Sequence, residues 1–254
     1  MKQTASAHVP KMPLINNESN DNLKAACANC SLRELCVPGG ISAEDLENLD
    51  NMVAMRRRVK KGRSLFHAGD DFTSLYAVRS GFFKTCINAN VGRDQITGFQ
   101  APGELLGLDG VAAERHGVDA IALEDSEVCI MPYSELERIA RDFPPLQHQL
   151  HRVMSRELVR DHGVMLLLGS MKADERVAAF LLNLSERYKR LGYSPDEFIL
   201  RMTRQEIGSY LGLKLETVSR TFSRFQEQQL IEAQGKSIKL IDIPALKKML
   251  DNGG

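Results

Sequence analysis

The segment 203–229, near the C-terminus, is the sequence feature that most restricts which folds this chain can adopt. Thr203 and Glu206 have the spacing of a capping box, in which a hydroxyl and a carboxylate each bond a free backbone N–H where a helix begins. Gly212 follows the helix predicted over Arg204–Leu211, where a glycine commonly ends a helix. A second helix is predicted over about Leu215–Gln229. Two helices joined by a short glycine-containing turn predict a helix-turn-helix.

The second predicted helix has two faces of different character. Its apolar positions, three or four residues apart, predict a side buried in the domain: Leu215, Val218, Phe222 and Phe225. A separate polar face near the helix start contains Glu216, Ser219 and Arg220. Because arginine can pair with guanine, glutamate can accept from cytosine and serine is adaptable, we expect these three to read bases in a major groove. The alternative is an ordinary solvated helix face.

The charge distribution is consistent with a nucleic-acid partner for this C-terminal part. The whole chain carries 33 Lys and Arg against 33 Asp and Glu, whereas residues 170–254 carry 14 against 11. The basic excess therefore lies beside the predicted reading helix, although a solvated surface explains it equally well. A hairpin predicted around Gly235-Lys236 adds a wing to the helix-turn-helix.

The five cysteines indicate metal or redox chemistry, because their number is odd and three are clustered. Cys27, Cys30 and Cys36 form a C-x2-C-x5-C pattern, whose close pair can reach one metal centre. Cys129 is the candidate fourth ligand: it alternates with Val128 and Ile130 on a predicted strand, so it points away from the core that they face. Cys86 is left over and is expected to be an ordinary strand residue. Iron–sulfur ligation is favoured, and structural zinc stays open as the alternative.

From about Val59 to Met131, short apolar or alternating runs are interrupted by frequent glycines. Many short strands separated by turns predict an antiparallel sandwich or barrel. Within it, Leu75–Val78 and Phe82–Ile87 flank Arg79-Ser80-Gly81, which predicts a hairpin.

A long helix is predicted after the strands, from Pro144-Pro145 to about Leu168. An apolar stripe along it, with spacings of three, four and seven, favours burial against a partner helix. Asp161 interrupts the stripe. We therefore expect a homodimer seam composed of Leu150, Met154, Leu158, Asp161, Met165 and Leu168.

The combination of these features resembles the CRP/FNR superfamily, and specifically its FNR branch of oxygen-responsive regulators. The similarity runs from about Cys27 through almost the whole chain. It is most specific over Cys27–Cys36, residues 74–81 (SLYAVRSG), residues 94–99 (DQITGF), residues 210–213 (YLGL) and residues 216–220 (ETVSR).

The resemblance implies an α+β fold with an N-terminal antiparallel β-roll (jelly-roll-like) sensor, a long dimerisation helix and a C-terminal winged helix-turn-helix. It implies a [4Fe–4S] cluster held by Cys27, Cys30, Cys36 and Cys129, whose loss in oxygen loosens the dimer and weakens binding to palindromic promoter DNA. Asp161 matches the family's interfacial acid, and Glu216, Ser219 and Arg220 match its base-reading positions.

The implied organisation is a flexible tail (1–24), a cysteine loop with the β-roll (25–142), a dimerisation helix (143–169) and the DNA-binding domain (170–254). We expect a cytoplasmic regulator that is not an enzyme, with RNA polymerase as a further partner and no membrane contact. Two positions depart from relatives. Lys214 replaces a threonine cap, and Gly92-Arg93-Asp94 stands where relatives can carry an acid that contacts RNA polymerase.

Other ligands known for this fold are less well supported. A cyclic-nucleotide pocket needs an Arg-Ser pair after its Gly-Glu, but here Gly103-Glu104 is followed by Arg115-His116. A haem sensor needs an axial ligand, and the placement of His67 and His116 alone is no evidence for one.

Overall fold

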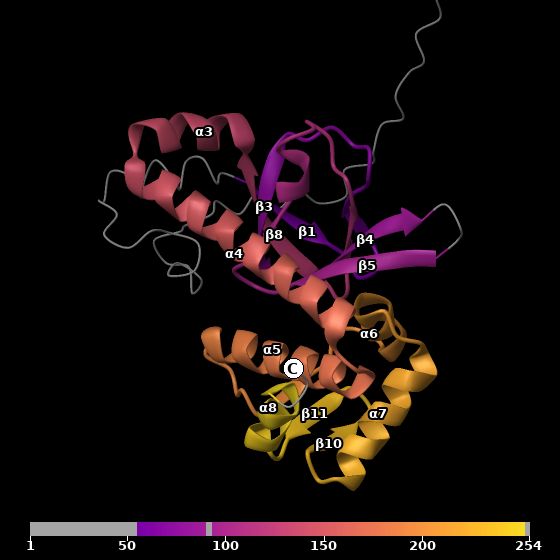
Figure 1. The fold of residues 1–254 in the computed structure, drawn as a ribbon. Helices are drawn as coiled ribbons and strands as arrows, with labels where there is room; N and C mark the ends of the chain where they lie inside the picture. Colours follow the sequence, from indigo (N-terminus) through magenta and orange to yellow (C-terminus); the bar gives the residue numbers. More distant parts are fainter. Residues whose placement is uncertain (1–54, 90–92, 252–254) are drawn as a thin grey trace, which may run out of the picture.

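The structure, a computed structural model, describes residues 55–89 and 93–251. An N-terminal half made of β-sheets is joined by a long helix to a mainly helical C-terminal half (Figure 1). The predicted α+β class is confirmed. Within the described ranges, no helix combines the length and apolar character that crossing a bilayer requires.

The N-terminal half is a sandwich of two antiparallel four-stranded sheets. One sheet has the order β1-β8-β3-β6 and the other β2-β7-β4-β5. Between the sheets lies a core that includes Phe66, Val78, Phe83 and Val128. The strands are β1 Met55–Val59, β2 Ser64–Phe66, β3 Ser74–Ser80, β4 Phe83–Ala89, β5 Arg93–Gln100, β6 Leu105–Leu106, β7 Asp119–Ala122 and β8 Ser126–Pro132.

The predicted hairpin between β3 and β4 is wrong. Strand β3 pairs with β8 and β6, whereas β4 pairs with β5 and β7, so the chain crosses between sheets at Gly81. Gly81 has φ +81°, and a Cβ there would lie 2.2 Å from Ser126 Oγ. The glycine therefore serves a corner that passes close to β8, and the consecutive buried residues Phe82 and Phe83 anchor that corner on both sides.

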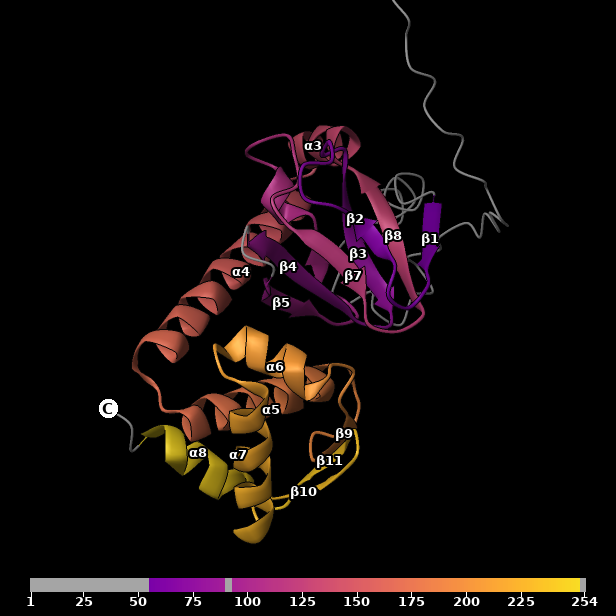
Figure 2. The same ribbon diagram turned by 90° about the vertical axis from the view of Figure 1, so that its right-hand side faces the viewer.

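Two helices follow the last strand of the sandwich. Helix α3 (Tyr133–Asp142) was not predicted, and the chain bends at Phe143 before α4 (Pro144–Ser170). Leu136 and Ile139 of α3 pack with Leu75 and Leu146 in a second apolar cluster outside the sandwich. Helix α4 closely matches the predicted long helix and runs from this cluster to the C-terminal half (Figures 1 and 2).

The C-terminal half combines a three-stranded sheet with four helices. Strands β10 and β11 form the predicted hairpin around Gly235, and β9 extends it to the order β10-β11-β9. The elements are α5 Ala173–Arg190, β9 Glu197–Ile199, α6 Arg204–Leu211, α7 Leu215–Glu227, β10 Ile231–Gln234, β11 Ser237–Leu240 and α8 Ile243–Asp251.

The two halves share one continuous apolar cluster. Phe99 of β5 packs edge-on against Phe180 of α5 and Tyr210 of α6, with ring centroids 6.0 and 5.2 Å apart. Arg187 of α5 donates to the carbonyl of Phe99 at 2.6 Å and pairs with Glu104. The C-terminal half is thus fixed to the sandwich through β5.

Candidate nucleic-acid interface and cysteine site

The predicted helix-turn-helix is present as α6, a short turn and α7. The Thr203 hydroxyl accepts from the Glu206 N–H at 3.2 Å, while the Glu206 carboxylate accepts from the Thr203 N–H at 2.7 Å. Gly212 has φ +63° and ends α6. A Cβ at Gly208 would lie 2.6 Å from the Leu213 carbonyl, so a glycine there lets the turn fold back onto α6. The capping-box prediction is confirmed.

The buried side of α7 differs from the prediction at its first residue. Val218, Phe222 and Phe225 are buried as expected, but 44% of Leu215 is exposed. Leu215 is the first residue of α7, immediately beyond the turn, where the helix has not yet reached the core. Thr221 is buried instead, because its hydroxyl has a partner on α5.

The polar face of α7 is available to a ligand in the described part of the chain. Glu216, Ser219 and Arg220 are all exposed and lie on the side of α7 away from the domain core. Figure 1 shows α7 along the outer edge of the C-terminal half. Lys214 precedes the helix and makes no side-chain cap, in agreement with the departure noted in the sequence.

Arg204 is a contact that sequence reasoning missed. Its guanidinium lies over the ring of Phe222, 3.2 Å from the centroid. Burial lowers its pKa to about 10, which leaves it positively charged at neutral pH. The stacked cation ties the first turn of α6 to the middle of α7 and stiffens the pair.

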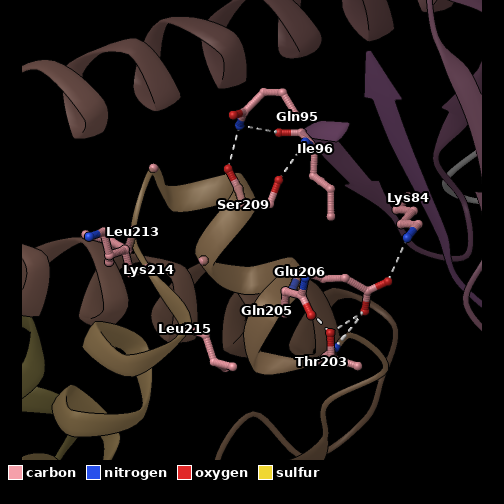
Figure 3. A pocket seen from close by; sticks show the side chains of 12 residues that line it. Lys84, Gln95, Ile96, Thr203, Gln205, Glu206, Ser209, Leu213, Lys214 and Leu215 are labelled. Carbon is pink, nitrogen blue, oxygen red and sulfur yellow. Dashed lines mark hydrogen bonds and ion pairs between the residues drawn. The ribbon is translucent and has the colours of Figure 1, made fainter. Parts of the chain in front are cut away.

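The sandwich contacts the helix-turn-helix at an open cleft of about 710 Å³ (Figure 3). Lys84 of β4 donates to Glu206 at 2.8 Å, and the Ile96 N–H of β5 donates to the Ser209 hydroxyl at 3.0 Å. Gln95 bonds the Ser209 carbonyl. Burial by itself would raise the pKa of Glu206, but the bonds from Lys84 and Thr203 outweigh it and hold that pKa below its ordinary value.

Cys129 lies where the alternation of β8 predicts. Val128 points into the sandwich core, whereas Cys129 is half-buried and packs with the outer cluster beside α3 and α4. Ile130 is half-buried rather than a core residue. Cys27, Cys30 and Cys36 lie outside the described residues, as does the predicted tail. Cys129 thus presents a thiol, the donor that iron–sulfur clusters use, on the outer face of the sheet.

Cys86 occupies a different environment from Cys129. It is 1% exposed and lies in the apolar cluster shared by the two halves, among Phe82 and Ile96. This agrees with the expected role as a strand residue. Among the described residues, no three potential metal ligands gather at one point.

The hollow between the sandwich and α4, of about 410 Å³, is poorly suited to a cyclic phosphate. Carboxylates of Asp109, Glu157 and Asp161 line it together with one cation, Arg160. Arg115 is exposed and pairs with Asp71 at 3.2 Å instead of lining the hollow. Buried His116 is stacked on Phe66 at 3.6 Å within the core.

The predicted seam residues of α4 are accessible along most of the helix. Leu150 packs partly on the outer cluster, whereas Asp161 is exposed. The other apolar residues of the predicted seam are exposed, from 37% at Leu168 to 64% at Met165; they are Met154, Leu158, Met165 and Leu168. Val159 and Leu166 widen this apolar surface. The seam itself stays a prediction.

Each half of the protein matches a known protein family. Residues 175–249 match the family described as Crp-like helix-turn-helix domain, and residues 56–143 match the cyclic nucleotide-binding domain. With the fold above, these matches define a DNA-binding transcription regulator rather than an enzyme.

Individual relatives narrow the class. The chain is 50% identical to the transcriptional activator protein Anr of Pseudomonas protegens over 86% of this chain and 90% of that protein. It is 39% identical to the fumarate and nitrate reduction regulatory protein of Escherichia coli K12 over 95% and 96%. The structure of FixK2 from Bradyrhizobium japonicum is 31% identical, covers 77% of this chain and 96% of that one, and has a TM-score of 0.71. The chain belongs to the CRP/FNR superfamily, as a regulator of the FNR type.

Proposed function

We propose that this regulator responds to oxygen through a [4Fe–4S] cluster held by Cys27, Cys30, Cys36 and Cys129, and binds palindromic promoter DNA as a homodimer. The observation that carries the proposal is the placement of Cys129, half-buried on the outer face of β8 beside the base of α4. One relative, from Pasteurella multocida, is named anaerobic regulatory protein and is 44% identical over 87% of this chain.

DNA reading, dimerisation and oxygen sensing are assigned to different parts of the protein. Glu216, Ser219 and Arg220 read base edges, since they form the exposed polar face of α7. The α4 seam brings two copies together, and two Asp161 carboxylates facing each other oppose that contact. A cluster held by Cys27, Cys30, Cys36 and Cys129 would supply an iron–sulfide core that oxygen can destroy.

Cys129 would connect the proposed cluster to the proposed dimer seam on α4. It shares the outer cluster with Leu146 and Leu150, which belong to the first turns of α4. Order at Cys129 therefore favours order at the start of the dimerisation helix. The proposed parts of the chain are a sensor (25–142), a dimerisation helix (143–169) and a DNA-binding domain (170–254). The proposed location of the protein is the cytoplasm. RNA polymerase is a further proposed partner.

The spectrum of anaerobically purified protein tests the cofactor. We expect a broad absorption at about 400 nm that bleaches in air, typical of thiolate-bound iron–sulfur centres. Cys129→Ser should lose it, whereas Cys86→Ser should keep it because that thiol is buried in the core shared by the two halves. A colourless protein containing zinc, or normal cluster content in Cys129→Ser, contradicts the proposal.

A further inference from the structure

Helix α5 holds the reading helix α7 through one carboxylate outside the proposed reading face. Asp174 lies in the first turn of α5. Its Oδ1 accepts a hydrogen bond from the Thr221 hydroxyl at 2.9 Å, and its Oδ2 pairs with the guanidinium of Arg224. Thr221 is buried, whereas 51% of the Arg224 side chain is exposed. One carboxylate thus joins two points of α7 that are three residues apart.

Arg224 lies close to the reading face. It follows Arg220 by four residues, which places the two side chains as neighbours on one side of the helix. Both line an open depression of about 390 Å³ between α5 and α7, together with Lys172 and Thr217. Among the residues that line it, Asp174 is the one carboxylate against three cationic side chains.

The apolar contacts of α7 do not by themselves fix its rotation. Val218, Phe222 and Phe225 hold the helix on the core, but apolar burial is non-directional and tolerates small rotations. A base-edge hydrogen bond tolerates an error of only about 0.5 Å in the position of its partner. The contacts of Asp174 are directional and charge-assisted, so they supply the orientation that the apolar stripe lacks.

We propose that Asp174 is a positioning residue for DNA reading: it fixes the rotation of α7 through Thr221 and occupies Arg224, which would otherwise bind phosphates of any sequence. The inference rests on the proposed function, since it takes Glu216, Ser219 and Arg220 as the reading face. Asp174 therefore raises the preference for the cognate site rather than the overall affinity.

The test compares two duplexes and uses the full chain under anaerobic conditions. One duplex is selected by the unchanged protein from a random library, and the other has random sequence. Asp174→Asn keeps an oxygen for Thr221 but loses the charge that holds Arg224. We expect the ratio of the two affinities to fall about tenfold, and the salt slope on random DNA to steepen by about two per dimer as two cations reach phosphates.

A matched control separates this effect from a simple change of charge. Glu175→Gln removes one negative charge on the same turn of α5 but keeps the oxygen that caps Lys172. We expect it to leave the affinity ratio nearly unchanged. Because misfolded molecules lower both affinities equally, the ratio does not respond to a merely structural defect.

A double-mutant cycle tests whether Asp174 acts through Arg224. Arg224→Ala removes the cation that Asp174 occupies but leaves the bond to Thr221, so it should leave the affinity ratio nearly unchanged. Adding Asp174→Asn to it should not steepen the salt slope on random DNA, because no freed arginine remains to bind phosphates. Thr221→Val removes the bond that fixes the rotation of α7 and changes no charge, so it should lower the affinity ratio, and it keeps the test decisive if Asp174→Asn fails to fold. An unchanged ratio in Thr221→Val, or a salt slope that steepens in the double variant as much as in Asp174→Asn, overturns the inference alone. If the unchanged protein selects no sequence, the proposed function fails and the inference fails with it.

Discussion

Lys84 of β4 and Glu206 of α6 form an ion pair, with 2.8 Å between Nζ and Oε1, across 122 residues of sequence. Both side chains are about four-fifths buried, with 21% and 19% exposed. The same Glu206 carboxylate caps α6 by accepting from the Thr203 N–H. One side chain therefore both begins a helix of the DNA-binding motif and attaches that motif to the N-terminal sandwich.

Loss of this pair should destabilise the protein in a pH-dependent way. Lys84→Met should lower the free energy of unfolding by about 1–3 kcal/mol at pH 7, because a charge-assisted bond to a partly buried carboxylate is lost. Since the folded-state pKa of Glu206 is held below its usual value, the pair stabilises fully above about pH 4.3, the value for an unfolded glutamate. That contribution should disappear as the pH falls through the lower, folded-state pKa.

Urea unfolding at neutral pH and at several acidic pH values measures this difference. The matched control is Lys60→Met, whose pair with Asp125 also spans 2.8 Å but is well exposed. We expect that control to cost much less than Lys84→Met, because water screens a pair of exposed side chains. Equal losses of unfolding free energy for the two variants at pH 7 would show that the Lys84–Glu206 pair stabilises the protein no more than an exposed pair does.

The contrast between Phe222 and Leu215 tests the packing of the reading helix. Phe222→Ala should cost about 3–5 kcal/mol, because it opens a cavity and removes the ring beneath Arg204. Leu215→Ala should cost about 1 kcal/mol or less, because 44% of that residue is already exposed to solvent. Thermal or urea unfolding of both variants checks this, and a large loss at Leu215 would contradict the orientation of α7.

The helix-turn-helix was predictable because its signals are local. Thr203 with Glu206 and Gly212 mark the ends of α6 within ten residues of one another. Leu215 misled the prediction, because spacing alone does not show that the first residue of α7 is partly exposed while Val218, three residues later, is buried.

Features that depend on distant parts of the chain were not predictable. The corner at Gly81 is set by the approach of Ser126 in another strand, so turn residues alone wrongly predicted a hairpin. Lys84 and Glu206 carry no sequence signal of their contact. The alternation of β8 did predict the direction of Cys129, because period two is a property of any strand.

Base reading by Arg220 can be separated from phosphate binding. Arg220→Ala should cost about 1–3 kcal/mol at one guanine of each half-site and relax the preference at that position only. Lys214→Ala is the comparison, because a lysine that binds phosphate affects all sequences alike. Competition between the selected site and its single-base variants at fixed salt measures both. Equal loss on every duplex would make Arg220 a backbone contact.

Asp161 should decide whether the cluster-free chain associates. Removing one carboxylate from each side of the seam relieves their repulsion, so Asp161→Ala should sediment as a dimer in air and bind DNA there. His162→Ala changes the next exposed residue without removing that charge and should behave as the unchanged chain. An aerobic monomer of Asp161→Ala at micromolar concentration would rule out this role for the seam.

The coupling of DNA affinity to the cluster is the central claim, and one titration measures it directly. Anaerobic protein bound to its selected duplex is exposed to measured amounts of air while the absorption at about 400 nm and the bound fraction of DNA are recorded together. We predict that both fall in parallel and that sedimentation shows monomers at the end. Full DNA binding after complete bleaching, or a protein that never carries the absorption, would contradict the account.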